Sequence, residues 1–103
     1  MRRALVVLSL AALLPLGIAG GQQPTVFRVP ISGTIENGLA PYVGRALGEA
    51  QSAGAAAVFL DINTPGGRID AAESIVDALR NTTTPVYAWV NPRAYSAGAM
   101  IAL

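Results

Sequence analysis

The feature of this sequence that most restricts its fold is a regular alternation of strand-like and helix-like segments. Short β-rich or apolar runs occupy residues 25–31, 55–62 and 86–90. Between them, residues 39–53 and 68–80 place apolar side chains three and four positions apart, the spacing of one helix face. This alternation predicts an α/β fold in which right-handed β-α-β crossovers build a parallel sheet.

Local signals refine this prediction for individual strands. Pro30, near the end of the first run, favours an edge position because proline cannot donate a backbone hydrogen bond. The second run (AAAVFLDI) is almost continuously apolar, which predicts a strand covered on both faces. Residues 91–93 (NPR) predict a turn that ends the third strand, and Ser96 then begins a further helix.

Glycine-containing motifs follow the second and third predicted strands. Residues 64–67 read TPGG and residues 96–98 read SAG, so that Ser96 lies 29 positions after Gly67. Taken singly, a βα turn explains the first motif and a serine N-cap explains the second. Parallel strands, however, bring their carboxyl ends to one edge of the sheet. Together the motifs predict backbone amides beside a serine hydroxyl, the minimum arrangement for acyl transfer.

The composition limits what that serine can do alone. The chain contains no histidine, no cysteine and no lysine, and its seven basic residues are all arginine. A serine hydroxyl needs a neighbouring base, and an arginine guanidinium stays protonated. We therefore expect the base to lie outside these 103 residues. This chain would then be the N-terminal part of a longer protein, and it would be inactive by itself. The charges form no basic patch that would indicate nucleic-acid binding.

The N-terminus has the order of an export signal. Two arginines precede 15 uncharged residues at positions 4–18, and small residues follow. This order predicts a signal peptide of residues 1–19, cleaved after Ala19, and leaves residues 20–103 as part of one domain. The alternative is a membrane-spanning anchor, but spanning requires about 20 apolar residues, and Pro15 would interrupt the helix.

Three stretches resemble a known protein family: residues 59–67 (FLDINTPGG), 85–90 (PVYAWV) and 94–102 (AYSAGAMIA). They are similar to the ClpP-class membrane-associated serine proteases of the NfeD type, which are related to signal peptide peptidase A. The resemblance extends over residues 26–103. It implies a ClpP/crotonase-like fold of βαβ units, incomplete at the C-terminus, and a serine endopeptidase that works through a Ser-Lys dyad and an acyl-enzyme.

The resemblance also implies roles for individual residues. Ser96 would be the nucleophile, and the backbone N–H groups of Gly67 and Ala97 would form the oxyanion hole. Because Gly67 has no Cβ, its backbone could approach a substrate carbonyl closely. The supporting loop positions are Thr64, Pro65, Gly66 and Gly98. The lysine would come from a later segment, and neither a cofactor nor a metal is implied. Asn63 departs from the family pattern, in which acidic residues are frequent, without an expected catalytic consequence.

For the whole protein, the resemblance implies a protein or peptide substrate with hydrophobic or membrane-associated segments. It further implies a stomatin-like membrane partner, a homo-oligomer, and a location on the extracytoplasmic side of a bacterial cell membrane. Two alternatives stay open. A crotonase-type acyl-CoA enzyme shares the fold, although the export signal argues against a cytoplasmic coenzyme A substrate. A non-catalytic scaffold for membrane proteins would be distinguished by the absence of a downstream lysine.

Overall fold

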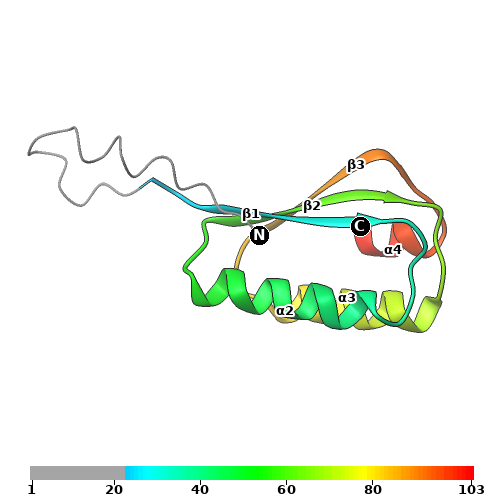
Figure 1. Ribbon diagram of the computed structural model, residues 1–103, viewed down its shortest axis with the longest axis horizontal. Helices are drawn as coiled ribbons and strands as arrows, with labels where there is room; N and C mark the ends of the chain where they lie inside the picture. The colour runs from blue at the N-terminus through cyan, green and yellow to red at the C-terminus, as the bar shows by residue number, and fades with distance from the viewer. Residues whose placement is uncertain (1–22) are drawn as a thin grey trace, which may run out of the picture.

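The computed structural model describes residues 23–103 and contains three strands that alternate with three helices (Figure 1). In chain order they are β1 (Val26–Ser32), α2 (Leu39–Ser52), β2 (Ala57–Thr64), α3 (Ile69–Asn81), β3 (Val86–Ala94) and α4 (Ala97–Ala102). The predicted signal peptide, residues 1–19, lies outside the described residues. The predicted β-α-β-α-β-α order is thus confirmed for the remainder of the chain.

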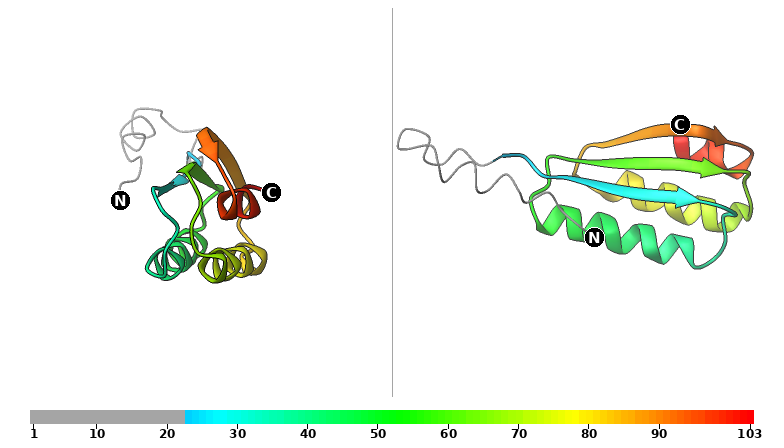
Figure 2. Two further views of the ribbon diagram at one scale, coloured as in Figure 1. Left: turned by 90° about the vertical axis from the view of Figure 1, so that its right-hand side faces the viewer. Right: turned by 45° about the horizontal axis from the view of Figure 1, so that its top comes forward.

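The three strands form one parallel sheet in the order β1-β2-β3. The register sets Val29 opposite Leu60, and Leu60 opposite Ala88. All three helices lie on the same side of this sheet, with α2 and α3 side by side and α4 beneath β3 (Figure 2). The parallel α/β architecture is as predicted, and β1, which carries Pro30, lies at an edge of the described sheet.

The hydrophobic core lies between the sheet and the helices. In β2 every second side chain is buried, so that Val58, Leu60 and Ile62 all face the helices. The helices supply the other side of the core through residues spaced three and four apart, as the sequence predicted. These buried helical residues are Val43, Leu47 and Ala50 of α2, Ala71, Ala72 and Ile75 of α3, and Ala97 and Ile101 of α4.

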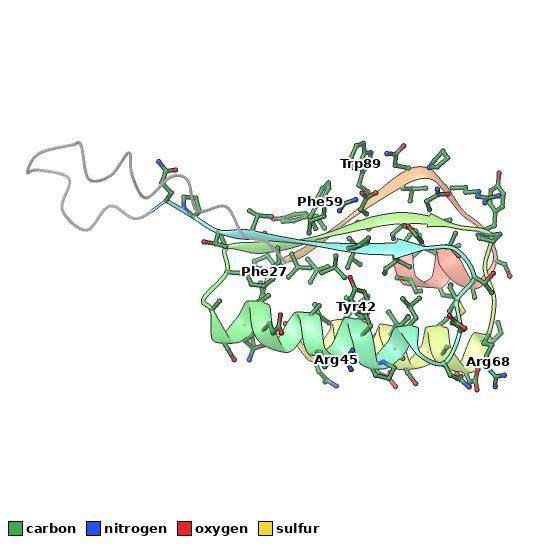
Figure 3. All side chains as sticks on the ribbon, in the orientation of Figure 1. Phe27, Tyr42, Arg45, Phe59, Arg68 and Trp89 are labelled. Atoms are coloured by element: carbon green, nitrogen blue, oxygen red, sulfur yellow. The ribbon has the colours of Figure 1, made fainter. Side chains whose placement is uncertain are left out.

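The prediction that β2 is covered on both faces is wrong for the described residues, because the helices occupy one face only. The other face carries the half-buried Phe59 and Asp61. Phe59 packs against Trp89 of β3 with ring centroids 5.7 Å apart, and Asp61 pairs with Arg28 of β1 at 2.6 Å. Phe59 and Trp89 project from the sheet on the side away from α2 and α3 (Figure 3).

The predicted turn at residues 91–93 is also wrong, because β3 continues to Ala94. The register between β2 and β3 shifts in this stretch: Ile62 pairs with Val90, but Thr64 pairs with Ala94. Two steps along β2 therefore correspond to four steps along β3, which is a β-bulge. Pro92 favours a turn in the sequence because proline has no backbone N–H to donate to a neighbouring strand. In the structure Pro92 lies within the bulge, where that hydrogen bond is not needed.

Between residues 23 and 103, no helix has both the length and the apolar character that a membrane crossing requires.

Candidate functional site

The loop after β2 and the turn after β3 lie against each other at the carboxyl edge of the sheet. The amide of Tyr95 donates a hydrogen bond to the carbonyl of Thr64 at 3.1 Å. Gly66 packs so closely against the second segment that no side chain would fit there. A Cβ built on Gly66 would lie 2.9 Å from the Cβ of Ser96 and 3.5 Å from the Ala97 nitrogen. The structure thus brings together the two motifs that the sequence places 29 residues apart.

Ser96 occupies a strained position between β3 and α4. Its backbone has φ 53° and ψ −121°, and among residues 23–103 it is the only non-glycine residue with a positive φ. An N-cap serine normally has extended backbone and bonds the first turn through its hydroxyl. Ser96 makes no such capping bond, although it directly precedes α4, and it is exposed. Capping therefore does not explain this serine, whereas a sharp strand-to-helix turn that presents a side chain is typical of nucleophiles.

The amides of Gly67 and Ala97 flank the junction of the two loops but differ in exposure, since Gly67 is exposed and Ala97 is 1% exposed. Among the hydrogen bonds that join described residues, none is donated by either group. Ala97 is the first residue of α4, where backbone N–H groups have no intrahelical partner. The groups that flank the Gly67 amide are held by Ile35, whose amide donates to the Gly66 carbonyl at 3.0 Å and whose carbonyl accepts from Arg68 at 2.9 Å.

The structure corrects the reason given above for the glycine at position 67. A Cβ built on Gly67 would overlap the carbonyl oxygen of Ile35 and would lie 2.7 Å from the Ile35 nitrogen. The space beside Gly67 is thus filled by the chain between β1 and α2. The glycine is required by this close approach of two backbone segments and by its φ of 156°, not by room for a substrate.

The supporting positions predicted from the sequence divide into two groups. Thr64, Gly66 and Gly98 are buried where the two loops meet. A Cβ built on Gly98 would lie only 2.5 Å from Cγ2 of Thr64, so α4 can pack this closely only with glycine there. Pro65, in contrast, is exposed and makes no hydrogen bond or ion pair within the described part of the chain.

Two arginines near these loops were not anticipated. Arg93 stacks over Tyr95 at 6.0 Å from the ring centroid and donates from Nε to the Asn63 side chain at 3.3 Å. Arg68 follows the TPGG loop and pairs with Asp70 at 2.7 Å. The hydrogen bond from Arg68 lowers the pKa of the exposed Asp70 carboxyl. The order "Arg-x-Asp" at a helix start was the available sequence signal for this pair.

The side chains of residues 23–103 form no cluster of the kind that holds a metal ion, and they include no histidine or lysine that could act as a base for Ser96. Within residues 23–103 no three histidine, cysteine, aspartate or glutamate side chains converge on one point. The whole chain lacks histidine and lysine, so arginine is its only basic side chain. At this edge the structure thus has an exposed serine and two backbone amides, of Gly67 and Ala97, that donate to no other described residue.

Comparison with known proteins identifies the family. A family model described as "NfeD1b, N-terminal domain" matches residues 25–103. Membrane protein NfeD1b of Bacillus subtilis is 42% identical over 103 residues, which cover 99% of this chain and 24% of that protein. Membrane-bound protease PH1510 of Pyrococcus horikoshii is 33% identical over 106 residues, which cover all of this chain and 24% of that protein. The chain thus spans about a quarter of these relatives' length.

Solved structures agree with the fold. A serine-to-alanine mutant of the 1510-N membrane-bound stomatin-specific protease superposes with a TM-score of 0.74 at 31% identity, over 79% of this chain and 41% of that one. A lysine-to-alanine mutant of the same protease, in complex with a substrate peptide, gives 0.71 at 34% identity, over 75% and 36% of the two chains.

A more distant structure shares the fold alone. ClpP1 of Listeria monocytogenes, as an asparagine-to-aspartate mutant, superposes with a TM-score of 0.70 at 23% identity, over 94% of this chain and 49% of that one. The expected ClpP-like fold is therefore confirmed. With the family model matched from residue 25 to residue 103, the chain belongs to the NfeD1b N-terminal domain family.

Proposed function

We propose that the protein containing this chain is a serine endopeptidase in which Ser96 is the nucleophile. The observation that carries the proposal is the position of Ser96. Its backbone is strained, its hydroxyl does not cap α4, and Gly66 packs directly against it. Backbone strain of this kind has a cost of roughly 1–3 kcal/mol, so it is retained where function requires it.

The proposed reaction follows from the groups at this edge. The Ser96 oxygen attacks the carbonyl carbon of a peptide bond, and the amides of Gly67 and Ala97 stabilise the negative oxygen that forms. The hydroxyl proton passes to a base and then to the departing amine as the C–N bond breaks. Water hydrolyses the resulting ester and regenerates Ser96. The chain contains no histidine and no lysine, so we assign the role of base to a lysine from another part of the protein, held neutral by burial.

The relatives support this mechanism and suggest the substrate class. One relative is named a membrane-bound protease, and structures of a stomatin-specific protease exist with a serine or a lysine replaced by alanine. By analogy, we assign membrane-associated or hydrophobic protein segments as substrates and a stomatin-like protein as partner. A homo-oligomer on the extracytoplasmic side of the cell membrane is part of the same proposal.

A serine-directed fluorophosphonate tests the nucleophile in the protein produced from the complete reading frame. We expect labelling of Ser96, identified by peptide mass spectrometry, and a loss of labelling by about 10³-fold or more in Ser96→Ala. Ser74→Ala is the matched control, because Ser74 is an exposed serine on α3. Unchanged labelling of Ser96→Ala would place the nucleophile elsewhere, and a folded wild-type protein that is not labelled would favour the non-catalytic scaffold.

A further inference from the structure

Thr64 connects the segments that form the candidate site. It is the last residue of β2 and is fully buried. Its hydroxyl donates to the carbonyl of Gly33 at 2.5 Å and accepts from the amide of Gly66 at 3.0 Å. Its own carbonyl accepts from the amide of Tyr95 at 3.1 Å. One residue therefore links the end of β1, the TPGG loop and the Ser96 turn.

The hydroxyl of Thr64 is hydrogen-bonded to the TPGG loop. By accepting from Gly66, it gives a buried amide a partner inside the protein. Ile35 then bonds the carbonyl of Gly66 and the amide of Arg68, on either side of Gly67. The Gly67 amide itself donates to no other described residue. Without the hydroxyl, the Gly66 amide would be buried without a partner, and the loop would have to turn to solvate it.

The methyl group of Thr64 lies against α4. Cγ2 of Thr64 lies against Gly98 of α4. A Cβ built on Gly98 would lie only 2.5 Å from this Cγ2. Gly98 is two residues after Ser96 and is also hydrogen-bonded to the Tyr95 carbonyl at 2.8 Å. A change of volume on either side of this contact would therefore shift the turn that contains Ser96.

We propose that Thr64 is a positioning residue that sets the distance between the free amide of Gly67 and the hydroxyl of Ser96. The hydroxyl fixes the loop, and the methyl group fixes the helix. This inference rests on the proposed function, because that function is what assigns a role to the Gly67 amide and to the Ser96 hydroxyl. A displacement of about 1 Å between reacting groups typically lowers a rate by about 10²-fold.

Two substitutions in the complete protein separate the two halves of the side chain. Thr64→Val keeps the volume and removes the hydroxyl, and we expect the rate of fluorophosphonate labelling at Ser96 to fall by about 10²-fold. Thr64→Ser keeps the hydroxyl and removes only the methyl group, and we expect a smaller loss of labelling, of about tenfold. Thr84→Val is the control for loss of a buried hydroxyl, because Thr84 is 8% exposed and precedes the opposite end of β3. Wild-type labelling of Thr64→Val, or equal losses in both Thr64 variants, would overturn the role of the hydroxyl.

A size exchange tests the methyl group and does not depend on whether Thr64→Val folds. We expect Gly98→Ala to lower labelling by about tenfold or more, because its Cβ meets Cγ2 of Thr64. Adding Thr64→Ser removes that Cγ2, so the double variant should recover most of the lost labelling. Additive losses in the double variant would contradict the proposed contact.

Amide hydrogen exchange keeps this inference separate from the proposed function. We expect the Gly66 amide to exchange at least about tenfold faster in Thr64→Val than in wild type, and at the wild-type rate in Thr64→Ser. If wild type were not labelled, the serine-protease proposal would fail, and exchange at Gly66 would still decide whether Thr64 holds the loop. Equal exchange in wild type and Thr64→Val would overturn the positioning role.

Discussion

β2 and β3 both end at the candidate site, yet they are supported very differently. β2 lies between two strands and has every second side chain buried in the core. β3 is exposed along most of its length and contributes no fully buried apolar residue to the core of the described chain. An apolar groove of about 440 Å³, lined in part by Val86, Ala88 and Met100, lies beside it. The TPGG loop therefore follows the well-buried strand, and the Ser96 turn follows the exposed one.

This difference shows where the geometry of the site originates. The Ser96 turn is located less by the packing of β3 than by contacts to the end of β2, namely the Tyr95–Thr64 hydrogen bond and the Gly98–Thr64 packing. Perturbations of β2 and its loop should accordingly have larger effects than perturbations of the outer face of β3. The predictions below test that order from the largest effect to the smallest.

The largest effect is expected at Gly67. Gly67→Ala places a methyl group against the backbone of Ile35, and neither backbone segment can move without breaking the hydrogen bonds that join them. We expect the free energy of unfolding of the complete protein to fall by about 3 kcal/mol or more. Gly48→Ala is the control, because Gly48 lies exposed on α2 with open space around it and alanine favours helices. Denaturant unfolding measures both, and equal stability would show that the loop does not pack against Ile35.

The next prediction compares the loss of stability when a large side chain is truncated in β2 and in β3. Leu60 of β2 is 1% exposed, and Leu60→Ala should cost about 2–5 kcal/mol through lost burial and a residual cavity. Trp89 of β3 is 51% exposed, so Trp89→Ala should cost about 1 kcal/mol or less. Chemical denaturation of both variants gives the two costs. A cost for Trp89→Ala as large as that for Leu60→Ala would mean that another part of the protein covers this face, and the contrast between the strands would disappear.

The smallest effect concerns the ion pair that follows the TPGG loop. The hydrogen bond from Arg68 lowers the pKa of Asp70, so its stabilising contribution is present above the unfolded pKa and is lost as the pH falls through the lower folded value. Arg68→Gln should return the Asp70 pKa toward its ordinary value. An NMR titration of the side-chain carboxyl checks this. Because both groups are exposed, melting temperatures at neutral pH should differ little, and an Asp70 pKa unchanged by Arg68→Gln would exclude the pair in solution.

The sequence predicted the element order well because local patterns determine it. The spacing of Val43, Leu47 and Ala50 marks one face of α2 whatever the rest of the fold does. The extent of β3 was not predictable in this way. Pro92 indicates a turn locally, and only the pairing of Ala94 with Thr64 shows that the strand resumes. Coverage of the sheet depends on where all the helices lie, which a single apolar run does not reveal.

For the site, the sequence predicted that the two motifs meet, but not what holds them. The need for glycine at position 67 comes from Ile35, which lies 32 residues earlier in the chain, and such a contact leaves no local pattern. The positive φ of Ser96 likewise depends on the whole strand-to-helix turn. The catalytic roles of Ser96, Gly67 and Ala97 stay predictions until the labelling experiment is done.

The bulge between β2 and β3 has a consequence for how this domain can diversify. Because pairing resumes at Ala94, β3 rejoins the ladder directly before the Ser96 turn after using two residues more than β2. We therefore expect substitutions within residues 91–93, such as at Arg93 beside Tyr95, to leave the pairing of Ala94 with Thr64 in place. In such an arrangement the surroundings of the turn can vary while its attachment to the end of β2 is kept.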